Sequence, residues 1–329
     1  MKKNISLLMA LVLLVTSMFA CGNKDSKEVS NTETKNFKIV TTIFPIYDWV
    51  KSILGDKFVK ENVSILLDNS VDLHNYQPTS ADIVEISNSD LFIYVGGESD
   101  EWVPDVLNQV SNTNLKTLNL MDSLSGSLQL EEEKEGMEES EEHEESAEEG
   151  EEYDEHIWLS LKNAKKMVSA ISNVIKEIDV DNAQAYEANA NAYIEKLQSL
   201  DEAYTNMANN ANNKMLIFGD RFPFLYMVKD YGLDYYAAFK GCSAETEASF
   251  KTIAFLTQKL DEYNLDYVMT IEGTNHKIAE TIIENSKDKN RTILELNSMQ
   301  STTANDINSG ASFFEIMNKN LEVLKQIIK

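Results

Sequence analysis

Short apolar runs rich in β-branched residues alternate along this chain with segments that have the spacing of amphipathic helices. The predicted strands are residues 37–43, 63–67, 91–95, 116–119, 215–218, 235–239, 267–271 and 292–296. The predicted helices between and after them include residues 47–54, 80–87, 250–263, 276–285 and 311–328. Alternation of strands and helices predicts parallel sheets whose faces are covered. We therefore expect an α/β fold with two lobes and mostly parallel sheets, residues 37–160 and 213–329.

The region between these lobes, residues 161–212, has a different pattern. No proline or glycine occurs from Leu161 to Asn210. One helix face is marked by apolar side chains at alternating steps of four and three: Tyr186, Ala190, Tyr193, Leu197, Leu200 and Tyr204. The spacing predicts a helix of roughly 25 residues, about 38 Å long, with Asp181 or Asn182 as its N-cap. Such a helix is either simply a long core helix or a rigid strut between the lobes.

The first residues have the pattern of an export signal. Two lysines precede an apolar run that ends near Ala20 and is too short for a stable membrane span. The following MFACGN resembles a bacterial lipobox, although Met18 and Phe19 depart from its usual residues. We expect residues 1–20 to be a signal peptide, Cys21 to be lipidated, and residues 21–36 to form a polar tether. The alternative is an ordinary signal peptide with an incidental cysteine.

Lipidation of Cys21 would leave Cys242 as the only thiol, so no disulfide is expected within the chain. The anchored chain would be exported and held on the outer face of the bacterial cytoplasmic membrane.

The formal net charge of −26 is concentrated in one segment. Residues 131–155 contain sixteen acidic residues and one lysine. This charge makes nucleic acid an unsuitable partner. The low complexity of the segment predicts a solvated acidic insertion in the N-terminal lobe, not a separate domain.

Two of the four histidines lie in segments that could hold a metal ion. His74 lies in VDLHNYQP, residues 71–78, and His156 lies in DEHIWL, residues 154–159. Imidazole is the commonest side-chain ligand for metals, and neighbouring carboxylates orient it. His74 follows the predicted strand 63–67, so it can point into the crevice where open α/β sheets bind ligands.

Several further segments, taken in order, resemble one family. The tract IVTTIFPIYD at residues 39–48, the two histidine motifs, and DLFIYVGGE at residues 90–98 are similar to the metal-binding substrate-binding lipoproteins of bacterial ABC transporters, of the zinc- and manganese-uptake type. FLY at 224–226, YGL at 231–233 and AETEAS at 244–249 continue the resemblance towards the C-terminus.

The resemblance implies two lobes joined by a long helix, with one divalent transition metal in the cleft. It implies that His74 and His156 are ligands from the N-terminal lobe. The family's third ligand is His or Glu, whereas this chain has FGDRF at residues 218–222. Asp220 is the candidate there, unless it is an ion-pair partner of Arg221 or a helix N-cap.

The fourth ligand of the family is an acidic residue shortly before the last helix. The corresponding position falls near Ala311, which cannot bind a metal. Glu272, at the end of strand 267–271, and Asp306 are the alternatives, and water could also complete the shell.

The resemblance implies a receptor, not an enzyme, that captures Zn²⁺ or Mn²⁺ and delivers it to a cognate ABC permease. The ion would be the transported ligand, with no organic cofactor, and the receptor would be a monomer. The insertion favours zinc, whereas a carboxylate at Asp220 favours the harder Mn²⁺. The alternatives are a surface adhesin with a structural metal, or a zinc hydrolase, against which stands the absence of an HExxH motif.

Overall fold

The computed structural model describes residues 37–68, 71–138, 152–243 and 247–328. The predicted signal peptide, Cys21 and the tether lie outside the described residues, as does the central part of the acidic insertion, residues 139–151. Asn36–Lys329 forms one compact unit. No helix among the described residues combines the length and apolar character needed to cross a membrane.

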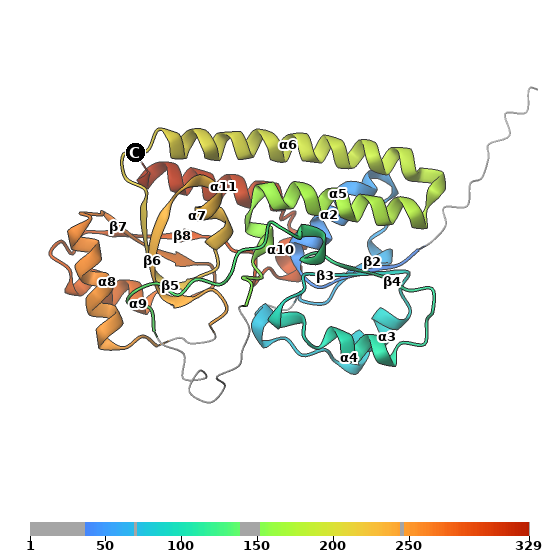
Figure 1. Ribbon diagram of the computed structural model, residues 1–329, viewed down its shortest axis with the longest axis horizontal. Coiled ribbons are helices and arrows are strands. Elements are labelled where there is room, and N and C mark those ends of the chain that lie inside the picture. The colour runs from blue at the N-terminus through green and yellow to red at the C-terminus, as the bar shows by residue number, and fades with distance from the viewer. Residues whose placement is uncertain (1–36, 69–70, 139–151, 244–246, 329) are drawn as a thin grey trace, which may run out of the picture. The chain divides into compact units, whose positions relative to one another are not determined.

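Two four-stranded parallel sheets form the centres of the two lobes (Figure 1). The N-terminal sheet has the order β2-β1-β3-β4, with strands β1 (Ile39–Thr41), β2 (Val63–Ile65), β3 (Leu91–Tyr94) and β4 (Lys116–Asn119). The C-terminal sheet has the order β6-β5-β7-β8, with strands β5 (Met215–Phe222), β6 (Asp234–Lys240), β7 (Tyr267–Ile271) and β8 (Thr292–Leu296). The two sheets therefore have the same strand order, and the predicted α/β fold is confirmed.

Helices connect the strands in each lobe. Those of the N-terminal lobe are α2 (Phe44–Leu54), α3 (Ser80–Ser87) and α4 (Val103–Gln109). Those that follow β5 are α7 (Leu225–Tyr231), α8 (Phe250–Glu262), α9 (Lys277–Asn285), α10 (Ala304–Asn308) and α11 (Phe313–Ile327). The sequence pattern missed α4, α7 and α10, because each is too short to show a clear helical period.

The long helix α6 (Ala183–Asn209) packs against elements of both lobes. It runs beside α5 (Leu161–Ile178) and α11 (Figure 1). The amide of Asn189 donates to the carbonyl of Ile53 in α2 (3.0 Å), and the hydroxyl of Tyr204 donates to the carbonyl of Met317 in α11 (2.7 Å). The predicted apolar face is buried, so α6 is fixed to both lobes along its length.

The start of α6 differs from the expected cap. Asn182 occupies the N-cap position but makes no side-chain hydrogen bond to the first turn. Its amide donates instead to Asp179 (2.7 Å), whose carboxylate also accepts from the hydroxyl of Tyr186. The polar side chains here stabilise the turn between α5 and α6.

Both described ends of the acidic insertion are packed against the body, contrary to the solvated insertion that the sequence predicts. Glu132 pairs with Lys229, and Glu131 and Glu133 pair with Lys240. The amide of Glu138 donates to the carbonyl of Ala238 (2.9 Å). Lysines of the C-terminal lobe thus compensate part of the negative charge of the insertion.

Candidate metal centre

The candidate site lies where loops leave the carboxyl ends of strands in both lobes. His74 lies in a 3₁₀ turn, Leu73–Asn75, which follows β2. Cys242 follows β6 and Gln300 follows β8. His156 directly precedes the 3₁₀ turn Ile157–Leu159, which leads into α5. This is the edge of a parallel sheet at which α/β proteins bind ligands.

The His74 ring is oriented by two groups of its own lobe. Its Nδ1 lies 2.9 Å from Oε1 of Glu155 and 2.9 Å from the hydroxyl of Ser99. The backbone amide of His74 donates to Asp72 (3.1 Å), which fixes the turn. A carboxylate on one ring nitrogen holds the imidazole in place and makes Nε2 the nitrogen that can bind a metal.

His156 is fully buried and has the same arrangement. Oδ1 of Asp154 accepts from the backbone amide of His156 (2.8 Å) and lies 3.1 Å from its Nδ1. The hydroxyl of Tyr226, in the C-terminal lobe, donates to the carbonyl of Asp154 (2.7 Å). Trp158 donates from its indole to the carbonyl of Ser298 (2.8 Å). The loop of His156 is therefore fixed from both lobes.

The amide of Gln300 lies between the two imidazoles. Its Nε2 is 3.2 Å from Nε2 of His74 and also contacts Nε2 of His156. Because each Nδ1 faces a carboxylate, the ring proton belongs on Nδ1 and each Nε2 is an acceptor. The amide of Gln300 can then donate one hydrogen bond to each histidine, and it occupies the position where both rings could bind one ion.

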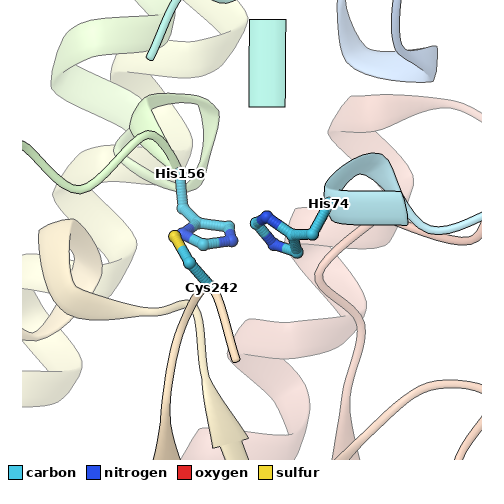
Figure 2. Close-up of side chains that lie close together, drawn as sticks. All are labelled: His74, His156 and Cys242. Carbon is cyan, nitrogen blue, oxygen red and sulfur yellow. The ribbon is translucent and has the colours of Figure 1, made fainter. Parts of the chain in front are cut away.

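Cys242 completes a group of three side chains (Figure 2). Its sulfur and one nitrogen of each imidazole lie within 4.8 Å of one another, and no other group of His, Cys, Asp or Glu in the described part of the chain has this arrangement. The thiol also lines a cavity of about 240 Å³ whose wall includes Glu98, Glu131 and Glu155. The group combines nitrogen and sulfur donors beside several carboxylates.

Neighbouring charges shift the pKa values of these groups. Burial acts to raise the pKa of Glu155, but the hydrogen bond and charge of His74 hold it below its usual value. Burial acts to lower the pKa of His156, but the Asp154 carboxylate raises it above its usual value. Burial and then the charges of Glu155 and Asp154 raise the pKa of the Cys242 thiol. The surroundings of the site therefore favour positive charge, as a cation-binding site requires.

The structure brings His74 and His156 together but places Asp220 outside their group. Strand β5 continues to Phe222 with a bulge between Phe218 and Arg221, so Asp220 lies within the strand and not after it. Its carboxylate accepts from the backbone amides of Arg221 (2.9 Å) and Ile271 (3.3 Å). The guanidinium of Arg221 pairs with Asp72 of the other lobe, so Asp220 is not its ion-pair partner.

Glu272 and Asp306 also lie outside the group. The Glu272 carboxylate accepts from the backbone amides of Ser298 (2.7 Å) and Gln300 (3.1 Å), so it positions the loop that carries Gln300. Asp306 forms a capping box with Thr303 at the start of α10.

Reasoning from the sequence missed Cys242 and Gln300. Both follow predicted strands, 235–239 and 292–296, as His74 follows 63–67. The same argument that placed His74 at the crevice could have identified them. It was applied in the C-terminal lobe only to the carboxylates Asp220 and Glu272.

Comparisons with known proteins place the chain in a family. Residues 39–327 match the family described as "Zinc-uptake complex component A periplasmic". The chain is 33% identical over 309 residues to the high-affinity zinc uptake system protein ZnuA of Bacillus subtilis. The aligned region covers 93% of this chain and 92% of that protein. It is 32% identical over 327 residues to the zinc-binding lipoprotein AdcA of Streptococcus pneumoniae, covering 98% of this chain but only 61% of AdcA.

Solved structures agree with this placement. The Zn(II)-bound ZnuA-like domain of Streptococcus pneumoniae AdcA has a TM-score of 0.69 and 29% identity, covering 89% of this chain and 98% of that domain. The metal-dependent lipoprotein YcdH of Bacillus subtilis has a TM-score of 0.70 and 30% identity, covering 89% of this chain and 99% of YcdH. With two histidines oriented by neighbouring carboxylates and a match over nearly its whole folded length, this chain belongs to the ZnuA family of zinc-uptake components.

Proposed function

We propose that the chain is an extracytoplasmic receptor that captures Zn²⁺ and delivers it to an ABC permease. The observation that carries the proposal is the pair of imidazoles whose Nδ1 atoms contact Glu155 and Asp154 while both Nε2 atoms contact one amide of Gln300. Two preoriented nitrogen donors that converge on one position suit a transition metal.

Zinc is the preferred cargo in this proposal, with Mn²⁺ as the alternative. Nitrogen donors bind Zn²⁺ more tightly than Mn²⁺ in the Irving–Williams order. The relatives AdcA and ZnuA are named for zinc. The ion is cargo, so the receptor performs no reaction and uses no organic cofactor.

Capture requires a small local rearrangement. The incoming ion takes the acceptor Nε2 atoms of His74 and His156, so it must displace the amide hydrogen bonds of Gln300. Since α6 is bonded to α2 and α11, we expect the loop of Gln300 to move more than the lobes. Small-angle scattering of the apo and zinc-loaded protein should give radii of gyration that agree closely; a large decrease on loading would contradict this step.

Anchoring and delivery form the remaining part of the proposal. A lipid on Cys21 would hold a monomeric receptor on the outer face of the cytoplasmic membrane, next to its permease. Cys21→Ser should release the protein into the medium while its zinc affinity stays unchanged.

The function is tested by metal titration and by growth. We expect one Zn²⁺ per chain, bound more tightly than Mn²⁺ in competition titrations. A deletion strain should grow poorly when zinc is chelated and recover when zinc is added. Stoichiometric zinc binding with normal uptake in the deletion strain would contradict the transport role, and absence of metal binding would contradict the receptor itself.

A further inference from the structure

We propose that Cys242 binds the captured ion as a thiolate and is the ligand supplied by the C-terminal lobe. This inference rests on the proposed receptor function and specifies its chemistry. It starts from the group of His74, His156 and Cys242, whose candidate ligand atoms lie within 4.8 Å of one another (Figure 2).

The spacing suits a common ion after a small contraction. With Zn–S near 2.3 Å and Zn–N near 2.0 Å, ligand atoms around a tetrahedral zinc are about 3.5 Å apart. Cys242 lies on the loop after β6, outside the strand ladder, so its side chain can move by this amount. His156, in contrast, is fully buried and held by Asp154. The contraction therefore falls mainly on the thiol.

The surroundings of Cys242 also distinguish it from a cysteine that only fills space. A packing cysteine behaves as a small apolar side chain among other apolar groups. The Cys242 thiol instead lines a cavity with five glutamates: Glu98, Glu101, Glu131, Glu152 and Glu155. The cavity gives a cation a negatively charged approach to Cys242.

The coordination step balances without another reactant. The S–H bond of Cys242 breaks, its proton leaves to water through the cavity, and one sulfur–metal bond forms. Two neutral imidazoles and one thiolate leave a charge of about +1 on a divalent ion, which the Glu155 and Asp154 carboxylates next to the histidines compensate.

The consequence is a change in metal preference. Thiolate is a soft donor that favours zinc over manganese, whereas carboxylates and water suit manganese. With Cys242 as the third ligand, the site discriminates against Mn²⁺ more strongly than two histidines and oxygen donors would.

The test uses cobalt as a spectroscopic substitute for zinc in the full chain carrying Cys21→Ser, so that Cys242 is the only thiol. The Co²⁺ complex should show a thiolate-to-cobalt charge-transfer band in the near ultraviolet. Adding Cys242→Ser should abolish the band and weaken Zn²⁺ binding on the order of 100-fold, since losing a ligand costs at least as much as disturbing a group behind one. Cys242→Asp should also lack the band but should bind Mn²⁺ better relative to Zn²⁺.

Folding is monitored by circular dichroism and by the metal-free unfolding midpoint, which should agree among the three proteins. A stoichiometric Co²⁺ complex without the band in the Cys242 protein would overturn the thiolate ligand and leave the receptor function intact. Failure of every protein to bind Co²⁺ or Zn²⁺ would overturn the receptor function and this inference with it.

Discussion

The two lobes contribute very different halves to the site. In the N-terminal half, His74 and His156 each have a carboxylate behind the ring, and the Nδ1 contacts of both rings are made within the same lobe. In the C-terminal half, Cys242 and Gln300 lie on loops after β6 and β8. The Gln300 side chain donates hydrogen bonds to the two histidines of the other lobe and so occupies their Nε2 atoms. In the proposed receptor the N-terminal half is thus preorganised for metal, and the C-terminal half would have to rearrange when metal binds.

The strongest test of the preorganised half removes one of its rings. His156→Ala should weaken zinc binding on the order of 1000-fold, because structural zinc sites gain about 10–16 kcal/mol from roughly four ligands. Competition titration against a chelator measures the loss. His276→Asn is the matched control, since His276 lies outside the group and has a left-handed backbone that Asn tolerates. Equal weakening of zinc binding by His156→Ala and His276→Asn would contradict the assignment of His156 as a ligand.

The pH dependence of the free energy of unfolding tests Asp100, a buried carboxyl group of the N-terminal lobe. Asp100 lies next to Ser99, is buried, and accepts from the backbone amide of Gly96 (2.9 Å). Burial, and then the charge of Glu155, raise the pKa of Asp100 to about 7, although the Gly96 hydrogen bond opposes the shift. The tyrosines Tyr76 and Tyr94 also face it.

Since the folded-state pKa of Asp100 lies above its unfolded value, its contribution to stability is present at acidic pH. It is lost as the pH rises from about 4 to about 7. At about 1.4 kcal/mol per pKa unit, the loss is on the order of 4 kcal/mol. Denaturant unfolding at pH 5 and pH 8 should show Asp100→Asn gaining clearly more stability relative to wild type at pH 8 than at pH 5. A gain of the same size at both values would contradict the assigned pKa.

The carboxylate behind His156 should matter less than the ring itself. Asp154→Ala removes the acceptor of both the Nδ1 proton and the backbone amide of His156. Loss of such an orienting group typically costs about 10–100-fold in metal affinity. The same titration measures the change, with Asp154→Asn as the control that keeps an acceptor oxygen. If Asp154→Ala binds zinc as wild type does, the N-terminal half is not preorganised by this contact.

The same contrast explains how far the sequence could predict the site. The strands and the long helix follow from local apolar patterns, and so most of their ends were predicted to within about two residues; the exception is β5, which continues to Phe222. The histidines were also predictable, because imidazole next to Asp and Glu is a typical metal-site combination. Gln300 is 226 positions from His74, and neither an amide nor a single cysteine indicates a metal. Only the tertiary structure brings them to the rings.

The adaptable half is tested by changing the charge of Gln300. Gln300→Glu should tighten zinc binding about tenfold, or about 1.4 kcal/mol, because a carboxylate can bind the ion and no longer donates to both Nε2 atoms. Gln300→Ala should change affinity less, since it removes both the competing hydrogen bonds and a potential oxygen donor. Weaker binding by the Glu variant would mean that the amide is not a competitor of the ion.

The smallest effect on metal binding is expected at Asp220, which the sequence suggested as the third ligand. Its oxygens accept from the amides of Arg221 and Ile271, and it stands outside the group of ligand atoms. Sites that share no partners affect one another by no more than about 0.5 kcal/mol. Asp220→Ala should therefore leave zinc affinity within about twofold. It should still lower the free energy of unfolding by about 1–3 kcal/mol, because buried amides lose their acceptor. Asp220→Asn, which keeps an acceptor oxygen, should recover part of that stability. A loss of zinc affinity comparable with that of His156→Ala would transfer the third-ligand role from Cys242 to Asp220, and the C-terminal half would then supply a hard oxygen donor in place of a soft sulfur.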